Sequence, residues 1–116
     1  MPDNLYIVLS KPPERIPAEE YDRWYHDHVR ENIVSPGFVS ARRYAIEPVP
    51  DNAPIPFTHL ALYEYQGEMS TWRTDLTRRI ETGDVVLPEW FPEITFGSWN
   101  CVPIDVRAEP VRKGKP

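Results

Sequence analysis

The richest concentration of residues able to do chemistry lies between positions 21 and 32. If this stretch is helical, one face carries residues spaced three and four apart, namely Tyr21, Trp24, Tyr25, His28 and Asn32. The opposite side carries the charged residues Asp22, Arg23, Asp27, Arg30 and Glu31. His28 is therefore expected to point inward among aromatic rings. Because burial disfavours imidazolium, His28 is predicted to be a neutral base near physiological pH.

Two other interpretations of this histidine compete with a catalytic role. A buried histidine is often a core residue satisfied by a hydrogen bond. His26 and His28 also form a His-x-His pair, but on a helix their side chains lie about 200° apart, and His26 falls on the more solvated flank. A metal would also have to recruit His59 and a carboxylate. We therefore predict no metal site.

Further candidates alternate along residues 58–65. His59, Ala61, Tyr63 and Tyr65 share one face of a strand, and Leu60 and Leu62 share the other. The polar and aromatic face either lines a pocket or meets a partner subunit, and the alternation alone does not choose between these.

Adjacent Arg42 and Arg43 must point to opposite sides of a sheet. An arginine in a pocket would clamp a carboxylate, and the alternative is an ordinary ion pair.

The chain has only five glycines and no glycine-rich phosphate loop, and its single cysteine, Cys101, has no neighbouring base. The sequence therefore predicts no cofactor.

The elements that must position these residues follow from periodicity and breakers. Strands are predicted at 5–9, 38–46, 58–65 and 94–102, and helices from 17 to about 32 and from about 69 to Gly83. Ser70 is the expected N-cap of the second helix. The spacing of its apolar residues predicts one buried stripe, made of Met69, Trp72, Leu76 and Ile80.

The order β-α-β-β-α-β predicts a ferredoxin-like α+β fold, in which two helices cover one face of a four-stranded antiparallel sheet. The other face would be bare and partly apolar, so we expect a homodimer. Residues 47–57 hold four prolines and should form a stiff loop, and residues 85–92 should cover the cleft mouth or a partner subunit. The tail from 103 to 116 is expected to be frayed.

Length and charge limit the class of protein. The chain has 116 residues, which is one domain with a core at about 5–102. Its net charge of −5 argues against nucleic acid and anionic membrane surfaces. No apolar stretch approaches a membrane span, and residues 1–4 lack the features of a signal peptide, so we expect a cytoplasmic protein.

Short motifs add a resemblance to this interpretation. Trp24-Tyr25-x-x-His28, then Ser35-Pro36-Gly37-Phe38, then Arg43-Tyr44 resemble the EthD-like branch of the dimeric α+β barrel superfamily over about residues 5–102. The stretch from Leu5 to His28 also resembles the 4-methylmuconolactone methylisomerases. The resemblance implies a dimer whose two sheets close a barrel, with small apolar or aromatic ligands between sheet and helices. The histidine, asparagine and tryptophan pattern of the haem-degrading members cannot be mapped onto this chain.

The resemblance and the helix face together suggest a cofactor-independent enzyme that isomerises, cyclises or dehydrates an aromatic, polyketide or lactone-like substrate. His28 would move the proton, and a tyrosine or His59 would polarise the substrate or return the proton. The expected substrate-binding residues are Trp24, Tyr25, Tyr63, Tyr65, Trp72 and Arg43. Two alternatives stay open: a cofactor-free monooxygenase, in which His28 deprotonates an electron-rich phenol, and a non-catalytic ligand-binding or accessory protein.

Overall fold

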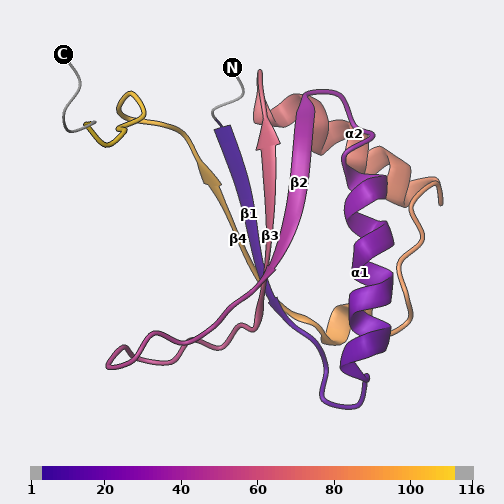
Figure 1. Cartoon of the computed structure of the whole chain (residues 1–116). Coiled ribbons are helices and arrows are strands. Elements are labelled where there is room, and N and C mark those ends of the chain that lie inside the picture. The colour runs from indigo at the N-terminus through magenta and orange to yellow at the C-terminus, as the bar shows by residue number, and fades with distance from the viewer. Residues whose placement is uncertain (1–3, 112–116) are drawn as a thin grey trace.

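The computed structural model describes residues 4–111 (Figure 1). In chain order the elements are β1 (Asn4–Lys11), α1 (Ala18–Asn32), β2 (Phe38–Ala45), β3 (His59–Tyr65), α2 (Met69–Glu81), a short 3₁₀ helix η1 (Phe91–Glu93) and β4 (Thr95–Cys101). The strands form one antiparallel sheet in the order β2-β3-β1-β4. Both helices lie on one side of the sheet (Figure 1). The predicted ferredoxin-like fold is confirmed.

The strand register settles which side chains face the helices. Val8 on β1 lies opposite Ala61 on β3 and Ser98 on β4, and Ala61 lies opposite Arg43 on β2. Val8 and Ala61 are buried, so this row and the residues two positions away along each strand face the helices. His59, Tyr63, Tyr65 and Arg43 therefore point toward the helices, and Leu60, Leu62 and Arg42 toward the open face.

The start of β2 explains the Pro36-Gly37-Phe38 motif. Gly37 has φ +103°, and a Cβ added to it would lie 3.1 Å from the carbonyl oxygen of Gln66. The backbone N–H of Gln66 in turn donates to the Gly37 carbonyl at 2.9 Å. Glycine is therefore required here both by the backbone conformation and by the close approach of the chain that leaves β3.

The core is aromatic to an unusual degree. Tyr21 and Tyr25 of α1 pack edge to face with ring centroids 5.5 Å apart, and Trp90 packs against Tyr21 with centroids 6.0 Å apart. All three residues are buried. Burying one large apolar side chain stabilises a fold by about 1.5–3 kcal/mol, so these rings hold α1 against the sheet and fix the direction of its inner face.

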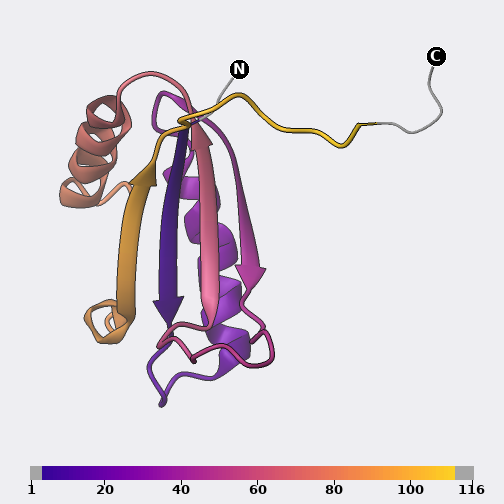
Figure 2. The ribbon, with the colours of Figure 1, turned by 90° about the vertical axis from the view of Figure 1, so that its left-hand side faces the viewer.

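Two expectations about α2 are wrong. Its N-cap is Glu68, so Ser70 lies inside the first turn and makes no capping hydrogen bond. Of the predicted stripe only Trp72 is buried, while Ile80 is 37% exposed and Arg79 is buried instead. The reason is the position of the helix, which lies out beside the β4 edge of the sheet (Figure 2). The expected stop is confirmed, because Gly83 follows the helix with φ +85°.

Two segments extend beyond the sheet on the side away from the helices (Figure 1). The loop between β2 and β3 is closed at its base by the Ile46 N–H, which donates to the Thr58 carbonyl at 2.9 Å. Residues 102–111 leave β4 without forming a helix or strand, and their apolar side chains are exposed. The expectation of a frayed tail also concerns residues 112–116, which lie outside the described residues.

No helix within residues 4–111 is long and apolar enough to cross a membrane.

Candidate functional site

A cavity of about 240 Å³ lies between the sheet and the two helices. Every layer of the fold contributes to its wall. The sheet supplies Tyr6, Val8, Tyr63, Phe96 and Ser98, α1 supplies Tyr25, His28 and Asn32, α2 supplies Leu76 and Ile80, and the segment before β4 supplies Leu87 and Phe91. The wall is thus mainly apolar and aromatic, with a few polar groups, as small-molecule sites usually are.

His28 is the one ionisable imidazole in this wall. Its side chain is buried, with 8% of the residue exposed, and its ring stacks on Trp24 with centroids 4.6 Å apart. Burial lowers the pKa of His28 to about 4 because the imidazolium loses its hydration. The predicted position of His28 on the inner face of α1 is confirmed. With so low a pKa its imidazole is neutral at neutral pH.

The Nδ1 atom of His28 is enclosed and has no hydrogen-bond partner. The nearest carboxylate oxygen, Oε1 of Glu31, lies 3.9 Å from it, which is beyond hydrogen-bond distance. Within residues 4–111 no backbone or side-chain group therefore hydrogen-bonds to Nδ1 at these side-chain positions.

Asn32 and Tyr63 form a second polar group in the wall. The Asn32 side-chain amide donates to the Tyr63 hydroxyl at 2.9 Å, while Oδ1 of Asn32 is buried without a partner. Burial raises the pKa of the Tyr63 and Tyr25 hydroxyls well above the usual value. Both hydroxyls are therefore neutral and keep a proton that they can donate. Asn32 and Tyr63 both line the cavity, so they can hydrogen-bond to a molecule bound there.

The segment from 85 to 92 closes one side of the cavity, as expected. Val85 and Trp90 are buried, and Leu87 and Phe91 reach the cavity wall. On the outside, the Arg15 guanidinium ties this segment to the loop before α1 by donating to the Glu89 carboxylate at 3.2 Å. The sequence could predict that this segment packs, because its large apolar side chains are costly to leave in water.

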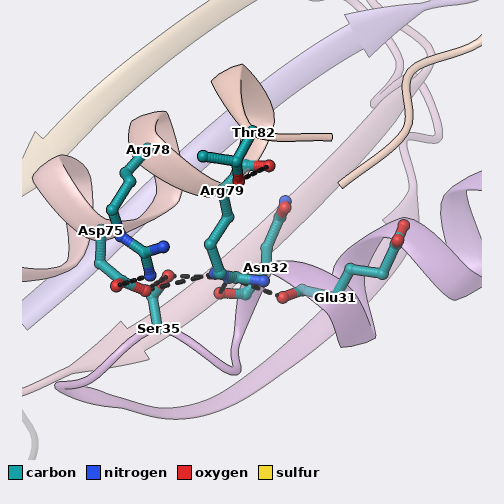
Figure 3. A network of polar contacts seen from close by, with 7 residues as sticks. All are labelled: Glu31, Asn32, Ser35, Asp75, Arg78, Arg79 and Thr82. Atoms are coloured by element: carbon teal, nitrogen blue, oxygen red, sulfur yellow. Dashed lines mark hydrogen bonds and ion pairs between the residues drawn. The ribbon is translucent and has the colours of Figure 1, made fainter. Parts of the chain in front are cut away.

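The C-terminal end of α1 is clamped by α2 (Figure 3). The buried Arg79 guanidinium donates to the carbonyls of Glu31 at 2.8 Å and Asn32 at 3.3 Å and to the Ser35 hydroxyl at 2.8 Å. Asp75 accepts from both Ser35 and Arg79 and balances the charge. Since the last carbonyls of a helix lack helical partners, this arginine acts as a cap supplied by another element.

His59 and Arg43 lie outside the cavity. Nε2 of His59 is 3.4 Å from the Asp22 carboxylate, and Arg43 pairs with the same carboxylate at 2.8 Å. The Arg43 guanidinium also sits over the Tyr25 ring, 4.7 Å from its centroid. This cluster lies at the other end of α1 from Asn32, so the structure does not bring His59 together with His28. Arg43 therefore forms an ion pair with Asp22 and does not face the cavity as a clamp for a ligand carboxylate.

The remaining predicted wall residues surround the cavity without lining it. Trp24 supports the His28 ring from behind. The Tyr65 hydroxyl donates to Asn100. Trp72 lines a neighbouring groove of about 460 Å³ between α2 and β4, which shares Tyr6 and Ile80 with the cavity. The groove therefore continues the cavity toward the β4 edge.

The sequence matches no protein-family model and no curated protein. Solved structures share its fold. A candidate monooxygenase from Shewanella loihica has a TM-score of 0.56 and 13% identity over 88% of this chain and 94% of its own. SnoaB, a cofactor-independent oxygenase from Streptomyces nogalater, has a TM-score of 0.52 and 16% identity over 92% and 99%.

A dimeric ferredoxin-like protein from an uncultured marine organism has a TM-score of 0.50 and 11% identity over 94% of this chain and 99% of its own. At these identities the likeness establishes the ferredoxin-like fold. It does not distinguish the EthD-like branch or the methylisomerases from other proteins with this fold.

Proposed function

We propose that this protein is an enzyme that removes a proton from a small aromatic or lactone-like molecule without a bound cofactor. The observation that supports this most is a neutral, buried imidazole in the wall of a largely apolar cavity. An apolar wall selects a flat hydrophobic ligand, and a neutral imidazole can accept a proton from it.

The reaction would begin at a carbon–hydrogen bond that is next to a carbonyl group or, as in anthrone, conjugated with one through an aromatic ring. Nδ1 of His28 is enclosed by protein atoms, so Nε2 would take the proton. As the carbon–hydrogen bond breaks, its electron pair moves to the carbonyl oxygen and forms an enolate. Returning the proton to another carbon isomerises the substrate, and delivering it to a hydroxyl group releases water.

The hydroxyl groups of the wall would stabilise the enolate. Tyr63 accepts its hydrogen bond from Asn32, so its own proton is free for the substrate oxygen. Burial keeps that hydroxyl neutral, and donors fixed in place before the reaction stabilise a developing oxyanion. The low pKa of free His28 is compensated in this state, because the imidazolium forms beside a negative charge.

A second candidate reaction shares the first step. Two of the solved structures with this fold are described as oxygenases, which favours a cofactor-free monooxygenase. There the deprotonated, electron-rich substrate would itself reduce oxygen. For anthrone, one O₂ would convert the methylene group into a carbonyl and release one water.

Anthrone separates these possibilities because its methylene protons are acidic and its anion reacts with oxygen. The protein would be incubated with anthrone in D₂O, first without and then with oxygen. Faster deuterium incorporation than without protein supports proton abstraction, and added oxygen uptake with anthraquinone formation supports the oxygenase. Binding without exchange or uptake, for anthrone and for a muconolactone, would contradict an enzyme and favour an accessory protein.

We also propose that the protein is a homodimer joined through the open face of the sheet. Trp99 on this face is 52% exposed and Tyr44 is 42% exposed. The loop between β2 and β3 and the segment after β4 extend on the same side (Figure 1), where Ile104 and Val106 are each 92% exposed. A second copy is the simplest partner that would cover these apolar groups.

A further inference from the structure

We propose that Glu31 is a positioning residue for His28, holding a proton on Nδ1 so that Nε2 is the free base. This inference rests on the proposed function of the cavity. The inference goes beyond that function by naming the group that would determine which imidazole nitrogen carries the proton. From the helix pattern alone Glu31 belongs to the solvated side of α1, so only the structure brings it forward.

The first reason is the unpartnered nitrogen. His28 is more than nine-tenths buried, and its Nδ1 has no hydrogen bond. The rings of Trp24, Tyr25 and Phe91 surround the imidazole and offer no acceptor to Nδ1. A buried polar atom in this position calls for a partner, and the nearest one able to accept a proton is Glu31.

The second reason is distance and freedom of movement. Oε1 of Glu31 lies 3.9 Å from Nδ1, one helical turn further along α1. A hydrogen bond requires a closure of about 1 Å. The Glu31 side chain is 37% exposed, so it can change rotamer without displacing the core.

The third reason is that the backbone of Glu31 is fixed. Arg79 holds the carbonyl of Glu31 at 2.8 Å and that of Asn32 at 3.3 Å (Figure 3). The Glu31 side chain can therefore change rotamer while the backbone at the end of α1 stays in place. The same clamp keeps Asn32 next to Tyr63.

Few charged groups lie near His28 and Glu31. Asp27 and the Arg79 guanidinium act on Glu31, whose pKa is raised mainly by partial burial. From the strands Tyr6 and Tyr63 line the same cavity, and the segment before β4 contributes Leu87 and Phe91. Within residues 4–111 no other carboxylate comes within 4 Å of the imidazole, so Glu31 is the group that can stabilise it when charged.

The consequence is a histidine–carboxylate pair. An Nδ1–H bonded to Glu31 leaves the Nε2 lone pair for the substrate proton. Once His28 is protonated, the carboxylate offsets its charge. Glu31→Gln keeps an oxygen acceptor but removes the charge, and Glu31→Ala removes both.

Nitrogen-15 NMR of the imidazole tests this without any substrate. We expect the Nδ1–H tautomer in the wild-type protein. Glu31→Ala should abolish this preference, and Glu31→Gln should lower the pKa of His28 by at least about half a unit. Asp27→Asn is the matched control, because it removes the same charge from an exposed neighbour of His28 and should leave the tautomer unchanged. Circular dichroism confirms that each variant is folded.

An Nε2–H tautomer in the wild-type protein would overturn the proposal. So would Glu31 variants whose tautomer and pKa match those of Asp27→Asn. With anthrone as probe, Glu31→Gln should lower kcat at least about tenfold and change KM little, since Glu31 does not line the cavity. If the wild-type protein binds anthrone and a muconolactone but turns over neither, the proposed function fails, and the NMR result still decides the role of Glu31.

Discussion

At the scale of single residues, the central feature is an imidazole that is both buried and unsatisfied. Satisfied core histidines contribute to stability through a hydrogen bond. His28 has no such bond at Nδ1, and its ring lines a cavity. The two histidines of α1 thereby differ in a way that can be measured, since His26 is exposed and lies against Arg30.

Replacing His28 should separate chemistry from folding. We expect His28→Ala to reduce turnover of anthrone, or of a muconolactone if that is the substrate turned over, by about 10²–10⁴-fold. This is the usual contribution of a positioned acid–base group, and the protein should stay folded. Steady-state kinetics and circular dichroism measure both properties. His26→Ala is the control and should change neither, and the mechanism is wrong if His26→Ala proves the more damaging substitution.

The same residue should make stability depend on pH. The pKa of His28 is about 4 in the folded protein and about 6.5 when exposed, so the unfolded chain binds an extra proton between these values. His28 therefore lowers the free energy of unfolding as pH falls from about 6.5 to 4, by about 3 kcal/mol in total.

Urea unfolding of the wild-type protein and His28→Gln across this range measures the effect. The glutamine variant should lose less stability on acidification than the wild-type protein, because the other titrating groups are shared. Parallel curves for the two proteins would show that His28 is not held neutral by burial.

At the scale of elements, α2 serves the site mainly as a clamp on α1. Its apolar residues line the cavity and the groove and do not bury a continuous stripe against the sheet. Its buried Arg79 instead holds the last turn of α1, where Asn32 lies (Figure 3). The position of α2 beside β4 leaves room for the cavity and lets this arginine reach across.

Adjacent arginines on α2 test this role. Arg79→Met should lower the free energy of unfolding by about 2–4 kcal/mol, because the carbonyls of Glu31 and Asn32 lose their buried guanidinium donor. Arg78→Met removes an exposed ion pair with the same Asp75, which solvent screens, so its effect on stability should be much smaller. Equal effects of the two substitutions in denaturant titrations would refute the clamp.

At the scale of the whole molecule, one face of the sheet is covered and the other is open. The helices and the segment from 85 to 92 enclose the cavity side, while the loop between β2 and β3 and the segment after β4 extend on the opposite side (Figure 1) and carry exposed apolar residues. A monomer would leave these groups in water. Association through the open face would bury them and leave the His28 cavity between sheet and helices of each subunit.

Light scattering with size-exclusion chromatography should therefore give a particle of about 27 kDa, twice the 13.6 kDa chain. Leu62→Glu on the open face should shift the protein toward monomer, because a carboxylate would be buried in the interface. Val86→Glu is the control, since Val86 is 71% exposed on the cavity side and should leave the dimer intact. A wild-type monomer at micromolar concentration would contradict the proposed dimer.

Local sequence patterns are enough to predict the order of elements, the helix face that carries His28, the helix end at Gly83 and the packing of residues 85–92. These depend on local periodicity, on turn residues and on the cost of exposing large apolar groups, all of which are written in neighbouring positions. The sequence could not decide which alternate residues of each strand face inward, because both faces of these strands carry apolar residues. Strand pairing decided that Tyr6 and Tyr63 line the cavity.

The tertiary structure alone decided the rest of the site. His59 and Arg43 share the inner face with Tyr63, yet Asp22 of α1 draws them into a separate cluster. Glu31 and Arg79 look like surface charges in the sequence, and only the approach of α2 to the end of α1 gives them their roles. Such contacts join residues far apart in the chain, so their geometry depends on how whole elements dock and not on any local pattern.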